Sequence, residues 1–320
     1  MRRTDVMTPK ATSTLIVIIL ALGFSACGRS KAEPTSPPAP VVVSTRSESA
    51  DPDLVKRIRT LCDGLEGDIG VAVMHVESGR MIEVEGAKKL PLYSVFKLPL
   101  AVTVLKEVEA KRVKLDAKVQ VKPTDVAPGS QYNTDLWRTA QEKTVTELIE
   151  LAIVRSDNTS ADKLLQLIGG PSAVTKQMRA LGFSNIEIVV TTREFAANRA
   201  KPNTGAAIDL VQLIAKLQKG EILQPSHTSL VFDFMERSKT GGDRRLRAFL
   251  PSGTRVADKT GTGDVATNDV GLITLPENKG HLAIAVLISG SKLPAERQEK
   301  TIADIARAAY DSFVSQPQAH

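Results

Sequence analysis

Residues 94–108 read Ser-Val-Phe-Lys-Leu-Pro-Leu-Ala-Val-Thr-Val-Leu-Lys-Glu-Val. The apolar residues recur at helical spacing and Pro99 falls in the first turns, so we expect a buried helix that begins at Ser94. Residues three apart lie on one face of a helix, which brings the Lys97 amine within reach of the Ser94 hydroxyl. Burial lowers the pKa of a lysine, so Lys97 is a candidate base that activates Ser94 as a nucleophile.

Further candidate motifs follow along the chain: Ser156-Asp157-Asn158, Glu194 with Asn198, and Lys259-Thr260-Gly261. Two other stretches match the Ser94-x-x-Lys97 and Lys259-Thr260-Gly261 patterns. Ser289-Gly-Ser-Lys292 matches the serine pattern but has no helix behind it. Lys239-Thr-Gly241 matches the lysine pattern but lies in a charged, Gly-rich stretch that is typical of a loop. Lys259 instead lies in a predicted strand, whose small residues let a ligand approach the backbone.

Strand-like patterns lie near both ends of the chain, and helical patterns fill the middle. A hairpin is predicted over residues 69–85 with its turn at Gly79, and three more strands over residues 255–261, 269–275 and 282–289. The simplest arrangement is an α+β fold, in which one antiparallel sheet is built from both chain ends and flanked by helices at 53–65 and 296–313.

The same pattern predicts the domain organisation. Residues 51–92 and 238–315 would form a discontinuous α/β lobe, and residues 93–237 an inserted all-α lobe. Ser94, Ser156 and Glu194 would come from the helical lobe and Lys259 from the sheet edge. We therefore expect the site in the cleft between the two lobes.

Taken in order, these motifs resemble those of the class A serine β-lactamases over about residues 50 to 315. The resemblance implies the β-lactamase/transpeptidase-like fold and hydrolysis of small-molecule β-lactam antibiotics through an acyl-enzyme on Ser94, with no cofactor. It also implies that Lys97 assists proton movement and that Ser156, beside Lys259, passes a proton to the departing ring nitrogen. The implied substrate-binding residues are Asn158, Asn198, Lys259, Thr260, Gly261 and Thr262, and the backbone N–H groups of Ser94 and Thr262 would form the oxyanion hole.

Residues 193–198, Arg-Glu-Phe-Ala-Ala-Asn, resemble the omega loop of that family, placed here at about residues 185–205. In the family, a glutamate and an asparagine of this loop hold the water that hydrolyses the acyl-enzyme, roles that fall to Glu194 and Asn198. The loop is short here, with Phe195 where relatives often have proline. A second hypothesis therefore stays open, a penicillin-binding D,D-peptidase or esterase-like relative with slow turnover.

Two further binding features are expected from the resemblance. The strand after Lys259 lacks the arginine with which many relatives bind the substrate carboxylate, and Arg245 is the candidate substitute. A solvated basic loop, formed with Arg244 and Arg247, is the alternative. Tyr132 or Trp137 is the candidate for an aromatic wall at the cleft mouth.

The first 26 residues have the features of a signal peptide. Basic residues precede an apolar stretch at 15–24, and Phe24-Ser-Ala-Cys27 resembles a bacterial lipobox. We expect an exported, periplasmic protein, anchored to the membrane by a lipid on Cys27 or released by ordinary signal cleavage, with a Pro-rich tether at 27–50. A third hypothesis, a non-catalytic envelope lipoprotein, is disfavoured by the intact serine and lysines.

Composition argues against other classes. The formal net charge is +6, and no basic run is interleaved with aromatic residues, so nucleic acid is not an expected partner. Neither a His-Glu-x-x-His motif nor a Gly-x-Ser-x-Gly elbow occurs, which argues against a metal site and an α/β-hydrolase triad. Cys27 and Cys62 are the only cysteines, and a lipid on Cys27 would leave Cys62 without an intramolecular partner, so we expect no structural disulfide. We expect a monomer.

Overall fold

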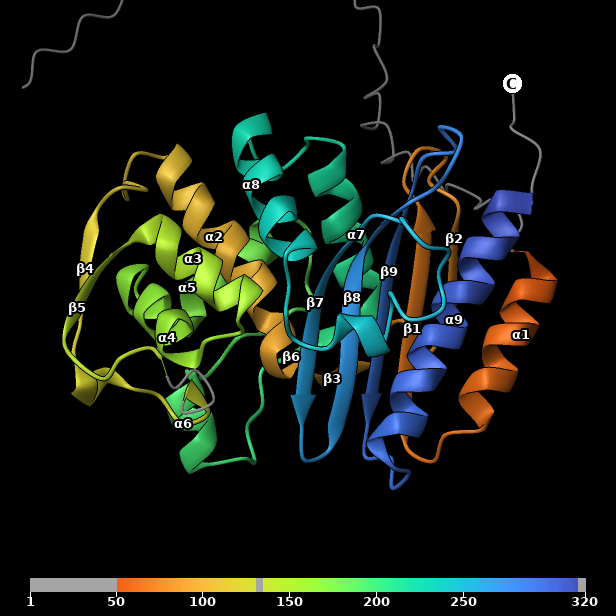
Figure 1. The fold of residues 1–320 in the computed structure, drawn as a ribbon, viewed down its shortest axis with the longest axis horizontal. Coiled ribbons are helices and arrows are strands. Elements are labelled where there is room, and N and C mark those ends of the chain that lie inside the picture. The colour runs from red at the N-terminus through yellow and green to blue at the C-terminus, as the bar shows by residue number, and fades with distance from the viewer. Residues whose placement is uncertain (1–50, 131–134, 316–320) are drawn as a thin grey trace, which may run out of the picture. The chain divides into compact units, whose positions relative to one another are not determined.

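A five-stranded antiparallel sheet organises the protein in the computed structural model, which describes residues 51–130 and 135–315. The strand order is β2-β1-β9-β8-β7, so the N-terminal hairpin joins the C-terminal strands through β1 and β9 (Figure 1). The strands are β1 (Asp68–His75), β2 (Met81–Val84), β7 (Val256–Gly263), β8 (Ala266–Thr274) and β9 (His281–Ser289). The predicted sheet from both chain ends is confirmed, including the β1–β2 turn at Gly79.

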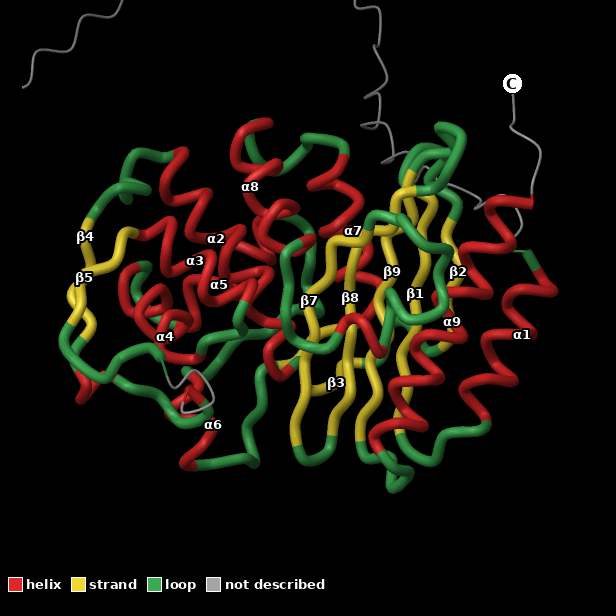
Figure 2. The backbone as a smooth tube through the Cα atoms, in the orientation of Figure 1, coloured by secondary structure: helices red, strands yellow, loops and turns green. Residues whose placement is uncertain are grey.

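Helices cover both faces of this sheet (Figure 2). Helices α1 (Pro52–Asp63) and α9 (Ala295–Ser315) pack together on one face, and α7 (Ala207–Gln218) packs on the other. Side chains of β1 alternate between two hydrophobic cores, because successive residues of a strand point to opposite faces. Val71 and Val73 join the core beneath α1 and α9, whereas Ala72 joins the larger core on the helical side.

The middle of the chain is mainly helical, as predicted. Its helices are α2 (Lys97–Glu109), α3 (Val145–Val154), α4 (Asn158–Leu167), α5 (Pro171–Ala180), α6 (Thr192–Ala197) and α8 (Pro225–Glu236). Two short strand pairs were not predicted. They are β3 (Lys89–Pro91) with β6 (Thr204–Ala206), and β4 (Lys118–Val121) with β5 (Gln141–Thr144), so the inserted segment is not purely helical.

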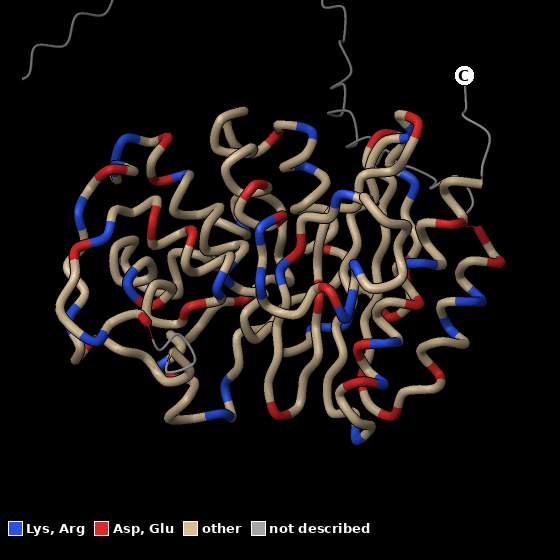
Figure 3. The backbone as a smooth tube through the Cα atoms, viewed as in Figure 1, with Lys and Arg blue, Asp and Glu red and all other residues tan. Residues whose placement is uncertain are grey.

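Charged residues of both signs are interleaved along the described chain (Figure 3). No helix among the described residues combines the length and the apolar character that a membrane span requires. Cys62 is a free thiol buried on α1. The predicted signal peptide, the tether and Cys27 lie outside the described residues.

Candidate active site

Ser94 lies at the junction between the sheet and the helical segment. It belongs to the 3₁₀ turn η1 (Tyr93–Phe96), and Lys97 is the first residue of α2. The α-helix therefore begins three residues later than predicted. Pro99 has no N–H to donate to the Val95 carbonyl, which removes one α-helical bond from the turn that carries Ser94 and favours the 3₁₀ form there.

The Lys97 side chain is fully buried and surrounded by oxygen atoms. Its amine lies 3.0 Å from Ser94 Oγ, 2.6 Å from Asn158 Oδ1 and 2.6 Å from the backbone oxygen of Ser156. Burial, followed by the positive charge of Lys259, holds the Lys97 pKa well below its ordinary value. An amine of this kind is suited to take the Ser94 proton near neutral pH.

Ser156 lies between α3 and α4, and its hydroxyl oxygen is within hydrogen-bond distance of two lysine amines. Its φ of 53° is in the left-handed region, which is unfavourable for a residue other than glycine and typical of a functional position. Lys97 Nζ and Lys259 Nζ lie 3.2 and 3.1 Å from Ser156 Oγ. Burial of Lys259 on β7 lowers its pKa to about 8. With its oxygen occupied by two donors, the Ser156 hydroxyl has its own proton available for a third group.

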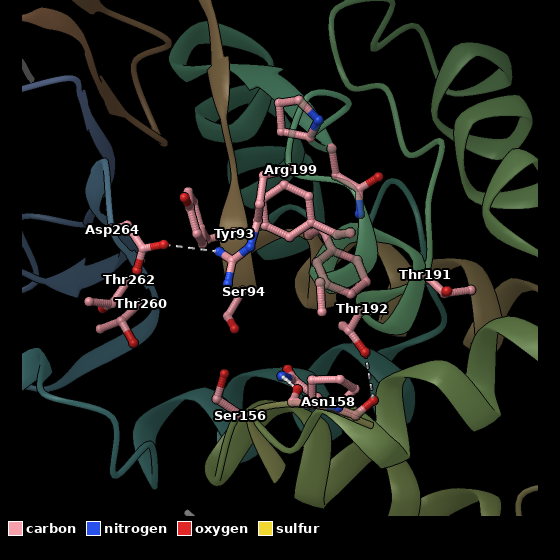
Figure 4. A pocket seen from close by; sticks show the side chains of 18 of the residues that line it. Tyr93, Ser94, Ser156, Asn158, Thr191, Thr192, Arg199, Thr260, Thr262 and Asp264 are labelled. Carbon is pink, nitrogen blue, oxygen red and sulfur yellow. Dashed lines mark hydrogen bonds and ion pairs between the residues drawn. The ribbon is translucent and has the colours of Figure 1, made fainter. Parts of the chain in front are cut away.

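A cavity of about 630 Å³ opens beside these residues. Its walls come from η1, α4, the α6 segment and the end of β7 (Figure 4). The predicted residues Ser94, Ser156, Asn158, Thr260 and Thr262 all line it. The structure therefore brings together, in one cleft, most of the site that the motifs predicted.

Arg245 is buried behind this cleft. Its side chain is 2% exposed, and Nη2 donates to the Thr262 hydroxyl at 2.8 Å. Glu299 Oε1 and the backbone oxygen of Asn268 hold the rest of the guanidinium at 3.2 and 2.8 Å. The alternative of a solvated basic loop is wrong for Arg245.

Comparison with known proteins decides the family. Residues 53–313 match the profile of the Beta-lactamase enzyme family. The chain belongs to this family. It is 29% identical to Beta-lactamase VEB-1 of Pseudomonas aeruginosa over 84% of this chain and 93% of that protein. Extended-spectrum beta-lactamase PER-1 of the same organism is 28% identical over 83% and 89% of the two chains.

Solved structures of β-lactamases agree with this assignment. The TLA-3 extended-spectrum beta-lactamase superposes with a TM-score of 0.79 and 31% identity, covering 83% of this chain and all of that one. The TLA-1 extended-spectrum beta-lactamase superposes with a TM-score of 0.78 and 32% identity, covering 82% of this chain and 99% of that one. The resemblance to class A serine β-lactamases and the α+β fold that it implied are thereby confirmed.

Gly261 allows a close backbone contact in this β-lactamase-family chain. A Cβ on Gly261 would lie 2.4 Å from the backbone oxygen of Leu92 and 3.2 Å from the Val95 nitrogen. Gly261 is also not among the residues that line the cavity. Its lack of a side chain lets β7 approach the serine turn η1, and its contact with substrate stays a prediction.

The predicted water site of Glu194 and Asn198 stays a prediction, because the Glu194 carboxylate is held by a neighbouring residue in the structure. Glu194 is exposed, and its carboxylate accepts from the backbone N–H and hydroxyl of Thr191 at 2.7 and 3.0 Å. This reciprocal contact is a capping box at the start of α6. Asn198 ends α6 and accepts from the Ala200 N–H. Neither residue lines the cavity.

The α6 segment instead contributes residues that sequence reasoning missed. Thr191, Thr192, Phe195 and Arg199 line the cavity, as do Tyr93, Thr240 and Asp264 from other elements. Thr240 belongs to the Lys-Thr-Gly match that was set aside as a loop, and it accepts the Thr260 hydroxyl at 2.6 Å. Its closeness to Lys259-Thr-Gly261 cannot be read from sequence spacing.

The aromatic candidates have separate outcomes. Trp137 is 3% exposed and donates to Asp157 at 3.1 Å, so it supports the Ser156 turn and does not form a wall at the cleft mouth. Tyr132 lies outside the described residues. Within residues 51–130 and 135–315, no group of histidine, cysteine and acidic side chains is arranged to hold a metal ion.

Proposed function

We propose that this chain hydrolyses β-lactam antibiotics through an acyl-enzyme formed on Ser94. The observation that carries the proposal is the 3.0 Å contact between Ser94 Oγ and the buried amine of Lys97. Burial lowers the Lys97 pKa, which gives a serine the base that it needs at neutral pH. The names of the relatives described above support the same activity.

Acylation follows from the contacts in the site. The Lys97 amine takes the Ser94 proton as the serine oxygen attacks the lactam carbonyl, and the amide C–N bond then breaks. The Ser156 hydroxyl gives its proton to the ring nitrogen, and the lysine on either side restores it. Backbone N–H groups of Ser94 and Thr262 would stabilise the oxyanion, a contribution of about 3–4 kcal/mol per donor in related chemistry.

Thr260 and Thr262 are the proposed receptors for the substrate carboxylate. Both line the cavity on β7, and the Thr262 hydroxyl accepts from Arg245. The guanidinium therefore places positive charge directly behind the threonine. Lys259, on the same strand as the two threonines, adds a second positive charge. Asn158, whose Oδ1 accepts from Lys97, is proposed to orient that lysine and to bind the side-chain amide of the substrate.

Hydrolysis of the acyl-enzyme is proposed to use Glu194 and Asn198 with a water molecule. In the structure the Glu194 carboxylate binds Thr191, so this step requires that the side chain leave the capping box. An exposed N-cap contact of this type is worth only about 1 kcal/mol, which makes the exchange accessible. The proposal depends on a small rearrangement of α6.

The test of this step is Glu194→Gln. We expect acylation to continue and release to slow by about 100-fold or more, as for loss of a general base. Mass spectrometry after exposure to benzylpenicillin should then show a persistent Ser94 adduct. Free enzyme at every time point would remove Glu194 from the mechanism.

A second candidate function is a slow-turnover, penicillin-binding relative. The specific observation that favours it is the exposed, capped position of Glu194 outside the cavity. Nitrocefin separates the two candidates, because sustained colour change requires repeated deacylation. A single stoichiometric burst with a stable adduct would support the second candidate, and Ser94→Ala should abolish both signals.

We also propose that residues 1–26 direct export and that Cys27 carries a lipid anchor in the periplasm. The lipobox-like residues 24–27 and the Pro-rich stretch after them support this proposal. Labelling with a fatty-acid analogue in a bacterial host should mark the native chain and not Cys27→Ser. The chain is further proposed to act as a monomer, which light scattering on the purified protein tests.

A further inference from the structure

Four side chains connect the two walls of the cavity at its mouth. The rings of Tyr93 and Phe195 meet edge to face with centroids 5.4 Å apart, and the Arg199 guanidinium lies 5.1 Å from the Phe195 centroid. Arg199 Nη1 then reaches Asp264 Oδ2 at 3.4 Å (Figure 4). We call these four residues the mouth bridge. It links the α6 segment to the turn between β7 and β8.

The ion pair in the mouth bridge is weak. The side chains of Arg199 and Asp264 are 55% and 81% exposed, and one contact of 3.4 Å joins them. Exposed ion pairs of this kind contribute little, since water screens both charges. Arg155, which also lines the cavity, instead donates two bonds of 2.5 Å to Asp135. Of these two arginines, Arg199 is the one that can change partner readily.

The position of Arg199 determines which part of a substrate it meets. The proposed receptors of the core carboxylate are Thr260 and Thr262, with Arg245 behind them. Asp264 follows Thr262 by two residues, and Arg199 faces Asp264 from the opposite wall of the cavity. The acyl side chain of a substrate held by Asn158 would extend between these walls, so its outer groups would reach the mouth bridge.

We propose that Arg199 is a specificity-determining residue that exchanges Asp264 for a negatively charged group on the acyl side chain of the substrate. A guanidinium offers paired donors that match a carboxylate. The substrate class is therefore β-lactams that carry a second carboxylate. This inference rests on the proposed function, because it concerns the same cavity.

The experiment compares benzylpenicillin with carbenicillin, which adds one carboxylate to the same acyl side chain. The second-order rate of Ser94 acylation is measured for both on the full chain. We expect Arg199→Gln to lower the carbenicillin-to-benzylpenicillin ratio about fivefold, the range of an exposed ion pair. Asp264→Asn should raise the ratio, since it removes the competing carboxylate. Lys201→Gln removes an exposed positive charge from the same segment and should leave the ratio unchanged.

An unchanged ratio in Arg199→Gln, or an equal loss for both penicillins, would overturn the inference while leaving the proposed function intact. If Arg199→Gln fails to fold, Asp264→Asn decides, because a ratio that stays constant or falls contradicts the exchange. High salt should lower the wild-type ratio, since exposed charges are screened. Failure of both penicillins to acylate the wild-type chain would instead overturn the proposed function, and the inference with it.

Discussion

At Ser156, two buried lysine side chains approach one hydroxyl oxygen. Lys97 and Lys259 are both fully buried, and the positive charge of Lys259 makes the positive form of Lys97 less favourable. The negative charge of Asp258 raises the Lys259 pKa and partly offsets the effect of burial. The Lys97 pKa is well below its ordinary value, whereas the Lys259 pKa is lowered only to about 8. Lys259 is therefore the cation near neutral pH, and Lys97 is the base.

This division of roles predicts the alkaline side of the pH profile. Above pH 8 the Lys259 ammonium loses its proton, so kcat/KM for nitrocefin should fall about tenfold per pH unit, as for one essential acid. In Lys259→Arg the guanidinium stays charged, and the fall should move above pH 10. The exposed lysine of the other Lys-Thr-Gly match provides the control, since Lys239→Arg should keep the wild-type profile. A fall that remains near pH 8 in Lys259→Arg contradicts the assignment.

Individual residues show where sequence reasoning succeeds and where it stops. Ser94 and Lys97 were predicted because helical spacing fixes their separation, whatever the rest of the fold. Glu194 was located by its motif, but the motif does not decide which way its side chain turns. The sequence does contain a pattern that accounts for the orientation of Glu194, because Thr191-x-x-Glu194 is a capping-box pattern.

Strand β7 and the turn η1 fix the two halves of the site relative to each other. The contact depends on glycine at two positions of β7. A Cβ on Gly261 would lie 2.4 Å from Leu92 O, and one on Gly263 would lie 1.7 Å from the Tyr93 ring. The β7 backbone therefore packs directly against the η1 backbone at Gly261 and against the Tyr93 ring at Gly263, which positions Lys259 relative to Ser94.

A methyl group at Gly261 should separate these elements. We expect Gly261→Ala to lower the free energy of unfolding by about 1–3 kcal/mol, as for overpacking of a dense core. It should also slow acylation of Ser94. Urea unfolding and nitrocefin kinetics measure the two effects. Gly64→Ala is the matched control, because its Cβ would meet only Leu61 O at an ordinary 3.6 Å, and we expect a change within about 0.5 kcal/mol. Equal stability of the two variants would show that β7 and η1 are not tightly packed.

The long elements could be predicted and the short ones could not. Strand β9 is a continuous apolar run from Leu282 to Ile288 because both of its faces are buried. The three-residue strands β3 and β6 have no measurable period, and Leu90 pairs with Gly205, far along the chain. That pairing depends on the assembled fold.

The sheet as a whole buries two carboxyl groups between charged neighbours. Asp258 on β7 and Asp269 on β8 are both inaccessible to solvent, and their pKa values are raised primarily by burial. The charge of Asp258 further raises the pKa of Asp269 well above its ordinary value. Among the described residues, Asp258 Oδ2 and Asp269 Oδ1 have no hydrogen-bond partner. These observations indicate that Asp269 keeps a proton in the folded protein.

A retained proton links the stability of the molecule to pH. Above the unfolded value near 3.8, the unfolded chain releases the Asp269 proton, whereas the folded protein holds it up to the raised pKa. The folded state then binds more protons than the unfolded state, so the free energy of unfolding decreases as pH rises through this window. For one proton the slope reaches about 1.4 kcal/mol per pH unit.

Asp269→Asn removes this pH dependence of the free energy of unfolding, since an amide does not titrate. The amide oxygen can still accept from the Leu246 N–H. We expect the variant to gain at least about 1 kcal/mol relative to wild type when the pH is raised from 4.5 to 7.5. Urea unfolding at both pH values measures the gain. Asp63→Asn, at an exposed position on α1, should show no such change. If the difference between Asp269→Asn and wild type is the same at both pH values, Asp269 is ionised in the folded protein and the buried pair is held by Arg245 and Arg247 alone.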